Sequence, residues 1–368
     1  MLIVTTQCFP PAMGGIESLI YHLAHEIGRM GQEVVVYADA GSGNEKSWSD
    51  TEQSFQAIRF GGLKPIRRRT KAKNIKLKLQ SQTKNPPVIL ADTWKSLEFL
   101  DTCLSTRTVC LAHGSELPQQ PSRQKLNRIS KAFAKADIII ANSNYTASRL
   151  AVYAHNKHID IIHPGIDIPV QDKSSNDDVL SMIGKKSPVL ITIARLEKRK
   201  GHHRVIDLLP KLIKDFPDLV YIIIGDGPLR SNLEAQVNQY ALQDHVRFIG
   251  PLTGPMKSAF LNNSDIFVMP GIQVGDDIEG YGIAYVEAAY FGVPGVASKL
   301  GGVVDAVTHG KTGLVCAPAD TDCLEDSLRS LITDSNYRDQ LGEDARKLAR
   351  ESLWNNRIKD YTKLLFKS

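Results

Sequence analysis

The chain has 368 residues, of which 42% are hydrophobic and 23% are charged, a composition typical of globular proteins. This length predicts two domains, each large enough to form its own hydrophobic core. No apolar run approaches the ~20 residues that a membrane-spanning helix needs. The apolar start Met1–Val4 has no basic segment ahead of it, so we expect a first core strand there and no signal peptide.

Positive charge is concentrated in one segment. Between Lys64 and Lys84 there are nine Lys and Arg residues and no Asp or Glu, so the net charge of +5 leaves 5 − 9 = −4 for the rest of the chain. Such a segment indicates a local anionic partner, either a membrane surface, a phosphorylated acceptor or nucleic acid, and a solvated surface loop explains it equally well. The candidate residues for a membrane or acceptor contact are Arg67, Arg68, Arg69, Lys71 and Lys73.

Five cysteines are present, an odd number without metal-ligand spacing. They are Cys8, Cys103, Cys110, Cys316 and Cys323. We therefore expect buried free thiols and a reducing cytoplasm.

The first half of the chain alternates short apolar runs with amphipathic segments. The pattern predicts strands at 2–5, 33–38, 56–60, 88–91, 108–112, 138–141 and 159–162, and helices at 16–30, 94–104 and 124–136. Short apolar strands separated by helices predict a parallel sheet that is covered on both faces.

The second half repeats this alternation after a polar stretch, 168–187, which we interpret as a linker. Strands are predicted at 189–194, 220–224, 246–249, 266–269 and 296–298, and helices at 203–216, 229–241 and in the tail, 344–366. The expected fold is therefore α/β, with two parallel-sheet domains in tandem. Because ligands of such sheets bind at the carboxyl ends of strands, the cleft between the two domains is the expected site.

The segment Glu279–Glu287 is the strongest candidate for a ligand site. Two glycines between Glu279 and a predicted helix start allow the backbone to approach a ligand closely. The free amides of that helix start, at Gly282 and Ile283, suit a phosphate, and Glu279 and Glu287 can accept hydrogen bonds from sugar or ribose hydroxyls. The alternative is a glycine-rich loop before an ordinary helix with two solvated glutamates.

Two cations follow the strand at 189–194. Arg195 supplies a planar fork and Lys200 a point charge, and together they can clamp a diphosphate. Since the run Arg195–Lys200 is rich in charge throughout, a solvated loop is an equal alternative.

Other strand ends carry weaker signals. Gly14 and Gly15 open a helix and suit a phosphate or a tight turn, whereas His113 suits a hydroxyl contact, proton transfer or a structural role. The run that begins at Gly225 lacks the third glycine of a dinucleotide fingerprint, because Arg230 stands there, and this argues against a nicotinamide cofactor. No histidine pair has metal-ligand spacing, and Asp276 and Asp277 lack a third ligand, so we expect no essential metal.

Taken together, these segments resemble glycosyltransferase family 4 (group 1), retaining enzymes of the GT-B fold. The resemblance covers nearly the whole chain and rests on Gly14–Glu17, Ala141–Ser143, His163–Asp167, Ala194–Leu196, Lys200-Gly201, Gly225–Pro228, Val246–Gly250, Gly301-Gly302, Thr312–Val315 and above all Glu279 and Glu287, the E-x7-E motif. It implies two Rossmann-like domains facing a cleft: an acceptor-binding domain at 1–168 and a nucleotide-sugar-binding domain at 188–351, joined by a linker at 169–187. A C-terminal helix at about 352–368 is expected to pack back on the first domain.

The resemblance also implies residue roles. Glu279 holds hydroxyls of the donor sugar, and Glu287 holds the ribose. Arg195 and Lys200 stabilise the departing diphosphate, assisted by amides of the helix starts; the implied donor-site glycines and neighbouring residues are Gly14, Gly15, Gly225, Gly250, Pro251, Gly282 and Ile283. His113 matches the family's histidine near the reacting sugar. The implied catalytic set is therefore His113, Arg195, Lys200 and Glu279, with no cofactor.

The resulting hypothesis is a hexosyltransferase that uses a UDP- or GDP-sugar and a lipid or lipid-linked glycan acceptor. We expect it in the cytoplasm at the inner face of the cell membrane, in contact with anionic lipid and not with nucleic acid. Front-face displacement with retention and without metal is the implied mechanism. The alternatives are a small soluble acceptor, a nucleotide-sugar-binding protein without catalysis, and a two-domain dehydrogenase.

Overall fold

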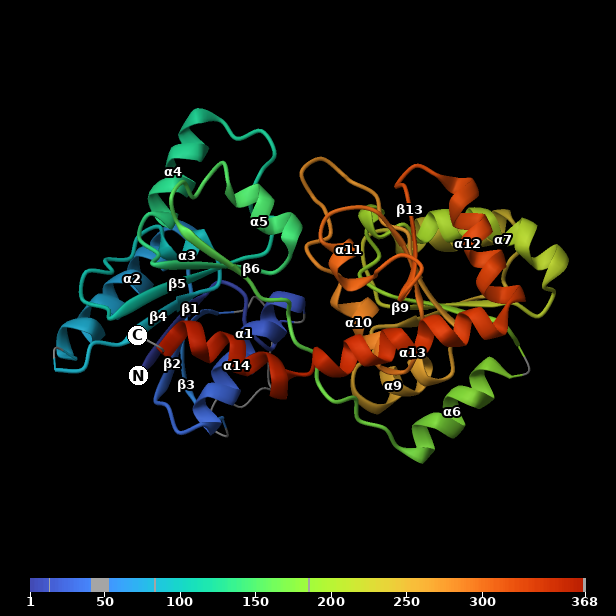
Figure 1. Cartoon of the computed structure of the whole chain (residues 1–368), viewed down its shortest axis with the longest axis horizontal. Helices are drawn as coiled ribbons and strands as arrows, with labels where there is room; N and C mark the ends of the chain where they lie inside the picture. Colours follow the sequence, from blue (N-terminus) through green and yellow to red (C-terminus); the bar gives the residue numbers. More distant parts are fainter. Residues whose placement is uncertain (13, 41–52, 83, 185, 367–368) are drawn as a thin grey trace. The chain divides into compact units, whose positions relative to one another are not determined.

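The chain forms two compact units in the computed structural model, which describes residues 1–12, 14–40, 53–82, 84–184 and 186–366 (Figure 1). The first unit comprises Met1–Gly165 and the C-terminal segment that begins at Trp354, and the second comprises Ile166–Leu353. Each contains one parallel sheet with helices on its faces. The expected α/β architecture of two Rossmann-like units is confirmed.

In the described part of the first unit, the sheet has the strand order β3-β2-β1-β4-β5-β6-β7, and all neighbours are parallel. Its strands are β1 (Leu2–Thr6), β2 (Val34–Asp39), β3 (Gln56–Phe60), β4 (Val88–Ala91), β5 (Arg107–Ala112), β6 (Ile138–Ala141) and β7 (His158–Ile161). Its helices are α1 (Gly15–Arg29), α2 (Lys64–Ser81), α3 (Trp94–Leu97), α4 (Arg123–Phe133), α5 (Asn144–Leu150) and α14 (Trp354–Phe366).

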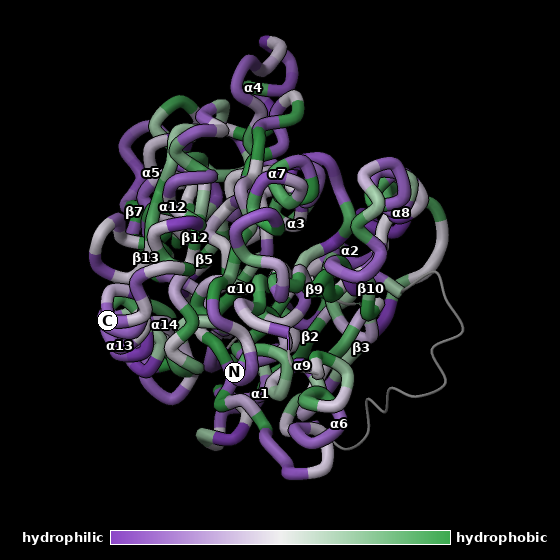
Figure 2. Tube along the Cα trace, turned by 90° about the vertical axis from the view of Figure 1, so that its right-hand side faces the viewer, coloured by the Kyte–Doolittle hydropathy of each residue, from purple (hydrophilic) through white to green (hydrophobic). Residues whose placement is uncertain are grey.

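Successive side chains of β1 pack in two different hydrophobic cores, one on each face of the sheet. Leu2 and Val4 pack in the cluster under α1 and α14, whereas Ile3 packs in the cluster under α2, α3 and α4. This follows from the period of two along a strand and explains why the strands are apolar throughout. Figure 2 shows hydrophilic colour concentrated on outer helices such as α4 and α13.

In the described part of the second unit, the sheet has the order β10-β9-β8-β11-β12-β13 and is also parallel. Its strands are β8 (Val189–Ile193), β9 (Val220–Ile224), β10 (Val246–Gly250), β11 (Ile266–Met269), β12 (Gly295–Ser298) and β13 (Gly313–Cys316). Its helices are α6 (Lys173–Ile183), a 3-10 turn η1 (Lys198–Lys200), α7 (His202–Asp215), α8 (Arg230–Gln239), α9 (Gly254–Asn262), α10 (Ile283–Tyr290), α11 (Val303–Ala306), α12 (Thr321–Thr333) and α13 (Ser335–Glu351).

The strand order of this second sheet places two loops side by side. The chain builds outward from β8 through β9 to β10, then returns to the other side of β8 with β11. The loops after β8 and β11 therefore diverge from adjacent strand ends, which is the topological switch point where open α/β sheets bind ligands. The first loop contains Lys200, and the second contains Glu279.

The stretch at 169–187 is not the linker that its composition predicted. Within it, α6 begins at the N-cap Asp172, whose carboxylate accepts a hydrogen bond from the amide of Ser175 at 2.7 Å. Val179 and Ile183 of α6 are buried in the core of the second unit, where the helix packs against α9. The apolar face of α6 is narrow, so the polar residues dominate its composition and conceal a structural helix.

The basic segment is a helix, α2, and not a solvated loop. Lys71 is buried and lies 2.7 Å from Asp39, and Arg67 lies 2.8 Å from the same carboxylate. Lys71 is therefore excluded as a surface contact, whereas Arg69 and Lys73 remain exposed. In the described ranges, no helix is both long and apolar enough to cross a membrane.

The tail forms two helices that belong to different units. Helix α13 packs on α10 in the second unit, and α14 packs on α1 in the first. Trp354, the first residue of α14, stacks on His22 with ring centroids 5.2 Å apart. A Cβ atom at Gly165 would lie 2.7 Å from the indole, so the return of the chain requires glycine at that position.

The cysteine prediction is wrong in part. Cys316 at the end of β13 and Cys323 in the first turn of α12 form a disulfide, with Cα atoms 5.8 Å apart. Cys8, Cys103 and Cys110 are free, and Cys103 is exposed. An odd number of cysteines therefore conceals one local pair, which the folding of β13 onto α12 brings together.

Thiol titration tests this pair. Without reductant, the denatured protein is expected to expose three reactive thiols, since two of the five cysteines are paired. Reduction should give five, and Cys316→Ser should give four without reductant. Five thiols in the protein purified without reductant would contradict the pairing.

Candidate active site

Glu279 lies among cations at the switch point of the second sheet. Its Oε2 atom is 2.9 Å from Nη1 of Arg199 and also accepts a hydrogen bond from the Lys200 ammonium. Burial raises the pKa of Glu279, but the charges of Lys200 and Arg199 outweigh it and hold this pKa below its usual value. The carboxylate is therefore ionised and positioned in a partly buried site, with an exposed side-chain fraction of 22%.

The helix that follows Glu279 begins at a glycine for a conformational reason. Gly282 has φ of +94°, and a Cβ atom there would lie 2.9 Å from the Tyr285 ring. This left-handed residue turns the chain into α10, whose first amides, at Ile283 and Ala284, have no acceptor within the helix. These N–H groups and the positive end of the helix suit an anion.

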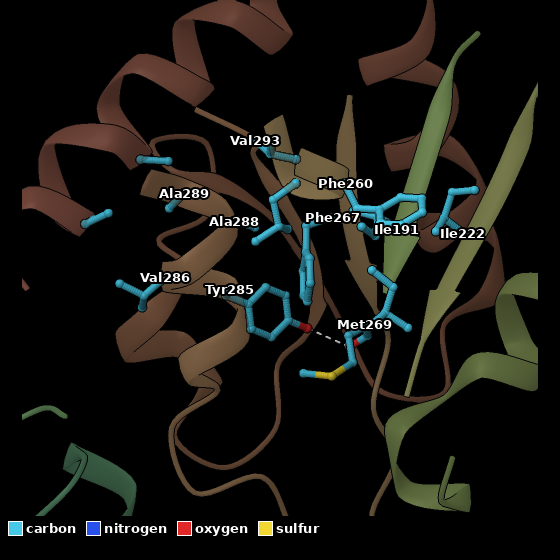
Figure 3. Close-up of a cluster of buried hydrophobic side chains, with 14 of the residues drawn as sticks. Ile191, Ile222, Phe260, Phe267, Met269, Tyr285, Val286, Ala288, Ala289 and Val293 are labelled. Carbon is cyan, nitrogen blue, oxygen red and sulfur yellow. Dashed lines mark hydrogen bonds between the residues drawn. The ribbon is translucent and has the colours of Figure 1, made fainter. Parts of the chain in front are cut away.

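Tyr285 fixes α10 against the end of β11. Its hydroxyl donates a hydrogen bond of 2.6 Å to the carbonyl of Met269, the last residue of the strand, and its ring meets Phe267 edge to face (Figure 3). A Cβ atom at Gly295 would lie 2.8 Å from the same ring. The helix start is therefore rigidly held at the sheet edge.

Glu287 has its own partner. Its Oε1 atom is 2.7 Å from the ammonium of Lys257 in α9, and both side chains are about a quarter exposed. The two glutamates of the E-x7-E motif thus lie in two separate ion pairs, and Lys257 is a residue that sequence analysis missed.

The loop after β8 turns sharply toward β11. Gly201 has φ of +78°, and a Cβ atom there would collide with the carbonyl of Pro270, just beyond β11. The turn η1 directs Lys200 and Arg199 to Glu279, whereas Arg195 pairs with Glu197 at 3.1 Å and is 70% exposed. Among the described residues, the cations at Glu279 are Arg199 and Lys200, and Arg199 is a residue that sequence analysis did not select.

The other glycines of this edge bring strand ends together. Gly225 has φ of +135°, and its amide donates a hydrogen bond of 2.8 Å to the carbonyl of Gly250. A Cβ atom at Gly225 would collide with the carbonyl of Ala194. Gly250 has open space beside it, and Pro251 is exposed. The glycine-rich run at Gly225 is thus a close-packed turn.

His113 lies at an equivalent edge in the first unit. It is buried, and its Nε2 atom is 2.9 Å from the backbone carbonyl of Asp92. Gly15 begins α1 in the same unit, and the carboxylate of Glu17 lies over Gly14.

Comparisons with known proteins agree with this geometry. Residues 176–348 match the family "Glycosyl transferases group 1", and residues 13–169 match "Glycosyltransferase Family 4". The chain belongs to the group 1 glycosyltransferases of family 4.

Similar proteins span the whole chain. A GDP-mannose-dependent alpha-(1-6)-phosphatidylinositol monomannoside mannosyltransferase of Mycolicibacterium smegmatis is 28% identical, with 97% of this chain and 96% of the relative covered. A GDP-mannose-dependent monoacylated alpha-(1-6)-phosphatidylinositol monomannoside mannosyltransferase of Corynebacterium glutamicum is also 28% identical, with 94% and 92% covered. The crystal structure of Anabaena Alr3699/HepE in complex with UDP has the same fold, with a TM-score of 0.82, 21% identity and 99% of each chain covered.

The site in the second unit of this glycosyltransferase carries positive charge. In the ranges that the structure describes, no group of three or more His, Cys, Asp or Glu side chains is arranged to hold an ion. The positive charge at the site comes from Arg199, Lys200 and the start of α10.

A buried histidine adjoins this site. His202 follows Gly201 at the start of α7 and is 2% exposed, and among the described residues neither of its ring nitrogens has a hydrogen-bond partner. Burial, with the nearby charges of Lys200 and His203, lowers the pKa of His202 from 6.5 to about 3. The imidazole is therefore neutral in the folded protein.

Acid should destabilise the protein through His202. The pKa of His202 is lower in the folded state than in the unfolded state. Below about pH 6.5 the unfolded state therefore binds a proton at this residue and the folded state does not, so the free energy of unfolding falls as the pH falls. Between about pH 6.5 and pH 5 the loss of unfolding free energy should be about 1.6 kcal/mol. His202→Leu should reduce this loss in urea unfolding, whereas the exposed control His155→Gln should not. Equal acid dependence in wild type and His202→Leu would contradict the assignment.

Proposed function

We propose that this glycosyltransferase moves a hexosyl group from a nucleotide sugar to a hydroxyl of a lipid or lipid-linked glycan. The observation that carries the proposal is the group of Glu279, Lys200 and Arg199 at the switch point, beside the free amides of α10. Relatives that match over almost the entire chain use GDP-mannose, so mannose is the first sugar to test. A protein of the same fold binds UDP, so uridine is the second donor base to test, in the form of UDP-sugars.

The second unit binds the donor in this proposal. The diphosphate accepts hydrogen bonds from the amides of Gly282 and Ile283 and pairs with Lys200 and the exposed Arg195. The Glu279 carboxylate accepts hydrogen bonds from the sugar, Glu287 accepts them from the ribose, and the base lies near Gly250 and Pro251.

The acceptor is assigned to the first unit, with His113 as its candidate contact. A buried His113 with a fixed backbone contact at Asp92 is oriented to bind one hydroxyl.

The proposed reaction proceeds with retention and without a metal. The bond between the anomeric carbon and the diphosphate oxygen breaks, and the nucleoside diphosphate leaves with the electron pair. The acceptor oxygen forms its bond on the same face, and its proton passes to the leaving diphosphate. Fixed cations and helix amides stabilise the developing charge, which supports a mechanism with neither a metal nor a protein nucleophile.

A small soluble acceptor is the second candidate. A D-inositol 3-phosphate glycosyltransferase of Corynebacterium urealyticum is 26% identical over 62% of this chain. The donor site is the same in both proposals, and product analysis with lipid and soluble acceptors distinguishes them.

Helix α2 supports a location at the inner face of the cell membrane. Its outer face carries the exposed apolar residues Ile66 and Leu77 beside the exposed cations Arg69 and Lys73. Apolar side chains flanked by cations suit the headgroup region of anionic lipid. Arg67 and Arg68 pair within the protein, with Asp39 and Glu98, so they contribute less.

Donor turnover tests the proposed site. Glu279→Gln and Lys200→Ala are each expected to lower mannosyl transfer or hydrolysis of GDP-mannose by about 100-fold, because each removes a fixed charge. EDTA should leave the wild-type rate unchanged. Glu325→Gln and Lys211→Ala are the matched controls, since these residues form a 3.1 Å ion pair elsewhere in the unit. Full activity of Lys200→Ala, or loss of activity in EDTA, would contradict the proposal.

Vesicle binding tests the location. Replacing Arg69 and Lys73 by glutamine should lower partition onto anionic vesicles by about 30-fold, since each basic residue contributes about 1 kcal/mol. Ile66→Gln with Leu77→Gln should also lower it. The controls are Lys214→Gln with Lys311→Gln for charge and Leu180→Gln for exposed apolar surface. Equal binding by the α2 variants and the controls would rule α2 out.

A further inference from the structure

Arg199 holds both ends of the loop between β11 and α10. Its backbone carbonyl accepts a hydrogen bond of 2.9 Å from the amide of Ile272, at the start of that loop. Its side chain reaches the other end, where Nε lies 3.1 Å from Asp277 and Nη1 lies 2.9 Å from Glu279. Nε also lies 3.1 Å from Glu197 in its own loop.

Lys200 is held much less firmly than Arg199. In the described part of the chain, its ammonium has one carboxylate partner, the same Glu279 Oε2 atom that Arg199 contacts. Arg199 has three carboxylate partners from two loops. Moving the Lys200 side chain breaks one ion pair, whereas moving the Arg199 side chain breaks three.

A diphosphate would draw these two cations apart. Two negative phosphates at the start of α10 compete with Glu279 for the ammonium of Lys200. Glu279 would then keep one cation, Arg199. Without that cation, burial would favour the protonated carboxyl, which accepts hydrogen bonds from hydroxyls less strongly than the carboxylate does.

We propose that Arg199 is a positioning residue that keeps Glu279 ionised and directed at the donor sugar while Lys200 exchanges from Glu279 to the diphosphate. The proposal rests on the proposed function of this site. It assigns different roles to adjacent cations. Lys200 binds phosphate, and Arg199 orients the Glu279 carboxylate that binds the sugar. Arg199 need not touch the donor.

A titration in the Lys200→Ala background, which removes Lys200 from Glu279 as the diphosphate would, tests the electrostatic half. Carbon NMR of side-chain-labelled glutamate, with the Glu279 signal assigned by its loss in Glu279→Gln, gives the midpoint directly. Arg199→Gln should raise that midpoint by about one pH unit or more, as expected when a carboxylate loses a paired cation. Arg199→Lys should restore it only in part, because lysine has no fork to bridge Asp277 and Glu279. Arg329→Gln is the control, since Arg329 also pairs with two carboxylates.

Binding and kinetics test the division of duties. In Arg199→Gln, kcat with GDP-mannose should fall about tenfold or more while the Kd of GDP changes less than about threefold, and the acid limb of the pH–rate profile should move to higher pH. Lys200→Ala should instead weaken GDP binding. Arg199→Lys should recover part of kcat.

The outcomes separate the two proposals. An unchanged Glu279 midpoint in Arg199→Gln, or a loss of GDP affinity equal to the loss of kcat, would overturn the role of Arg199 in an active enzyme. A wild-type protein that neither binds GDP or UDP nor turns over their sugars would reject the proposed function, whatever the titration shows. A shifted midpoint with preserved GDP binding and reduced kcat would support both.

Discussion

The ion cluster at the end of β8 and β11 is the constraint on which the site depends. Three carboxylates, Glu197, Asp277 and Glu279, meet Arg199 and Lys200 in a partly buried position. Removing one member of such a cluster leaves a charge without its partner, so the group must form as a unit. It forms because the two loops leave neighbouring strands on either side of the switch point.

Backbone geometry makes that approach possible. Gly201 allows the β8 loop to lie against the carbonyl of Pro270, and Gly282 turns the β11 loop into α10. Tyr285 then ties α10 to Met269, so the helix start is fixed at the strand end (Figure 3). Rigid elements thus position charges whose side chains would otherwise be free, which is what stabilisation of a departing diphosphate requires.

Buried charge serves a different purpose in the first unit. Asp39 at the end of β2 holds Lys71 and Arg67, so that α2 is tied to the sheet by its inner cations. Its outer cations, Arg69 and Lys73, are left exposed beside Ile66 and Leu77. One highly basic helix can therefore supply both a structural ion pair and a surface for anionic lipid, and only its folding decides which residue does which.

The sequence by itself determined the alternation of strands and helices and the two parallel sheets, and it selected Glu279, Glu287 and Lys200 as candidate site residues, because apolar runs, glycine turns and motif spacing are local signals. It did not predict α6, whose narrow apolar face is hidden in a polar composition, or the pairing of Cys316 with Cys323. Only the tertiary structure decided that Arg199, and not Arg195, meets Glu279, and that Lys257 meets Glu287. Within a run of similar cations, the direction of each side chain is set by the turn at η1 and by a loop some 80 residues away, and no local pattern encodes that distance.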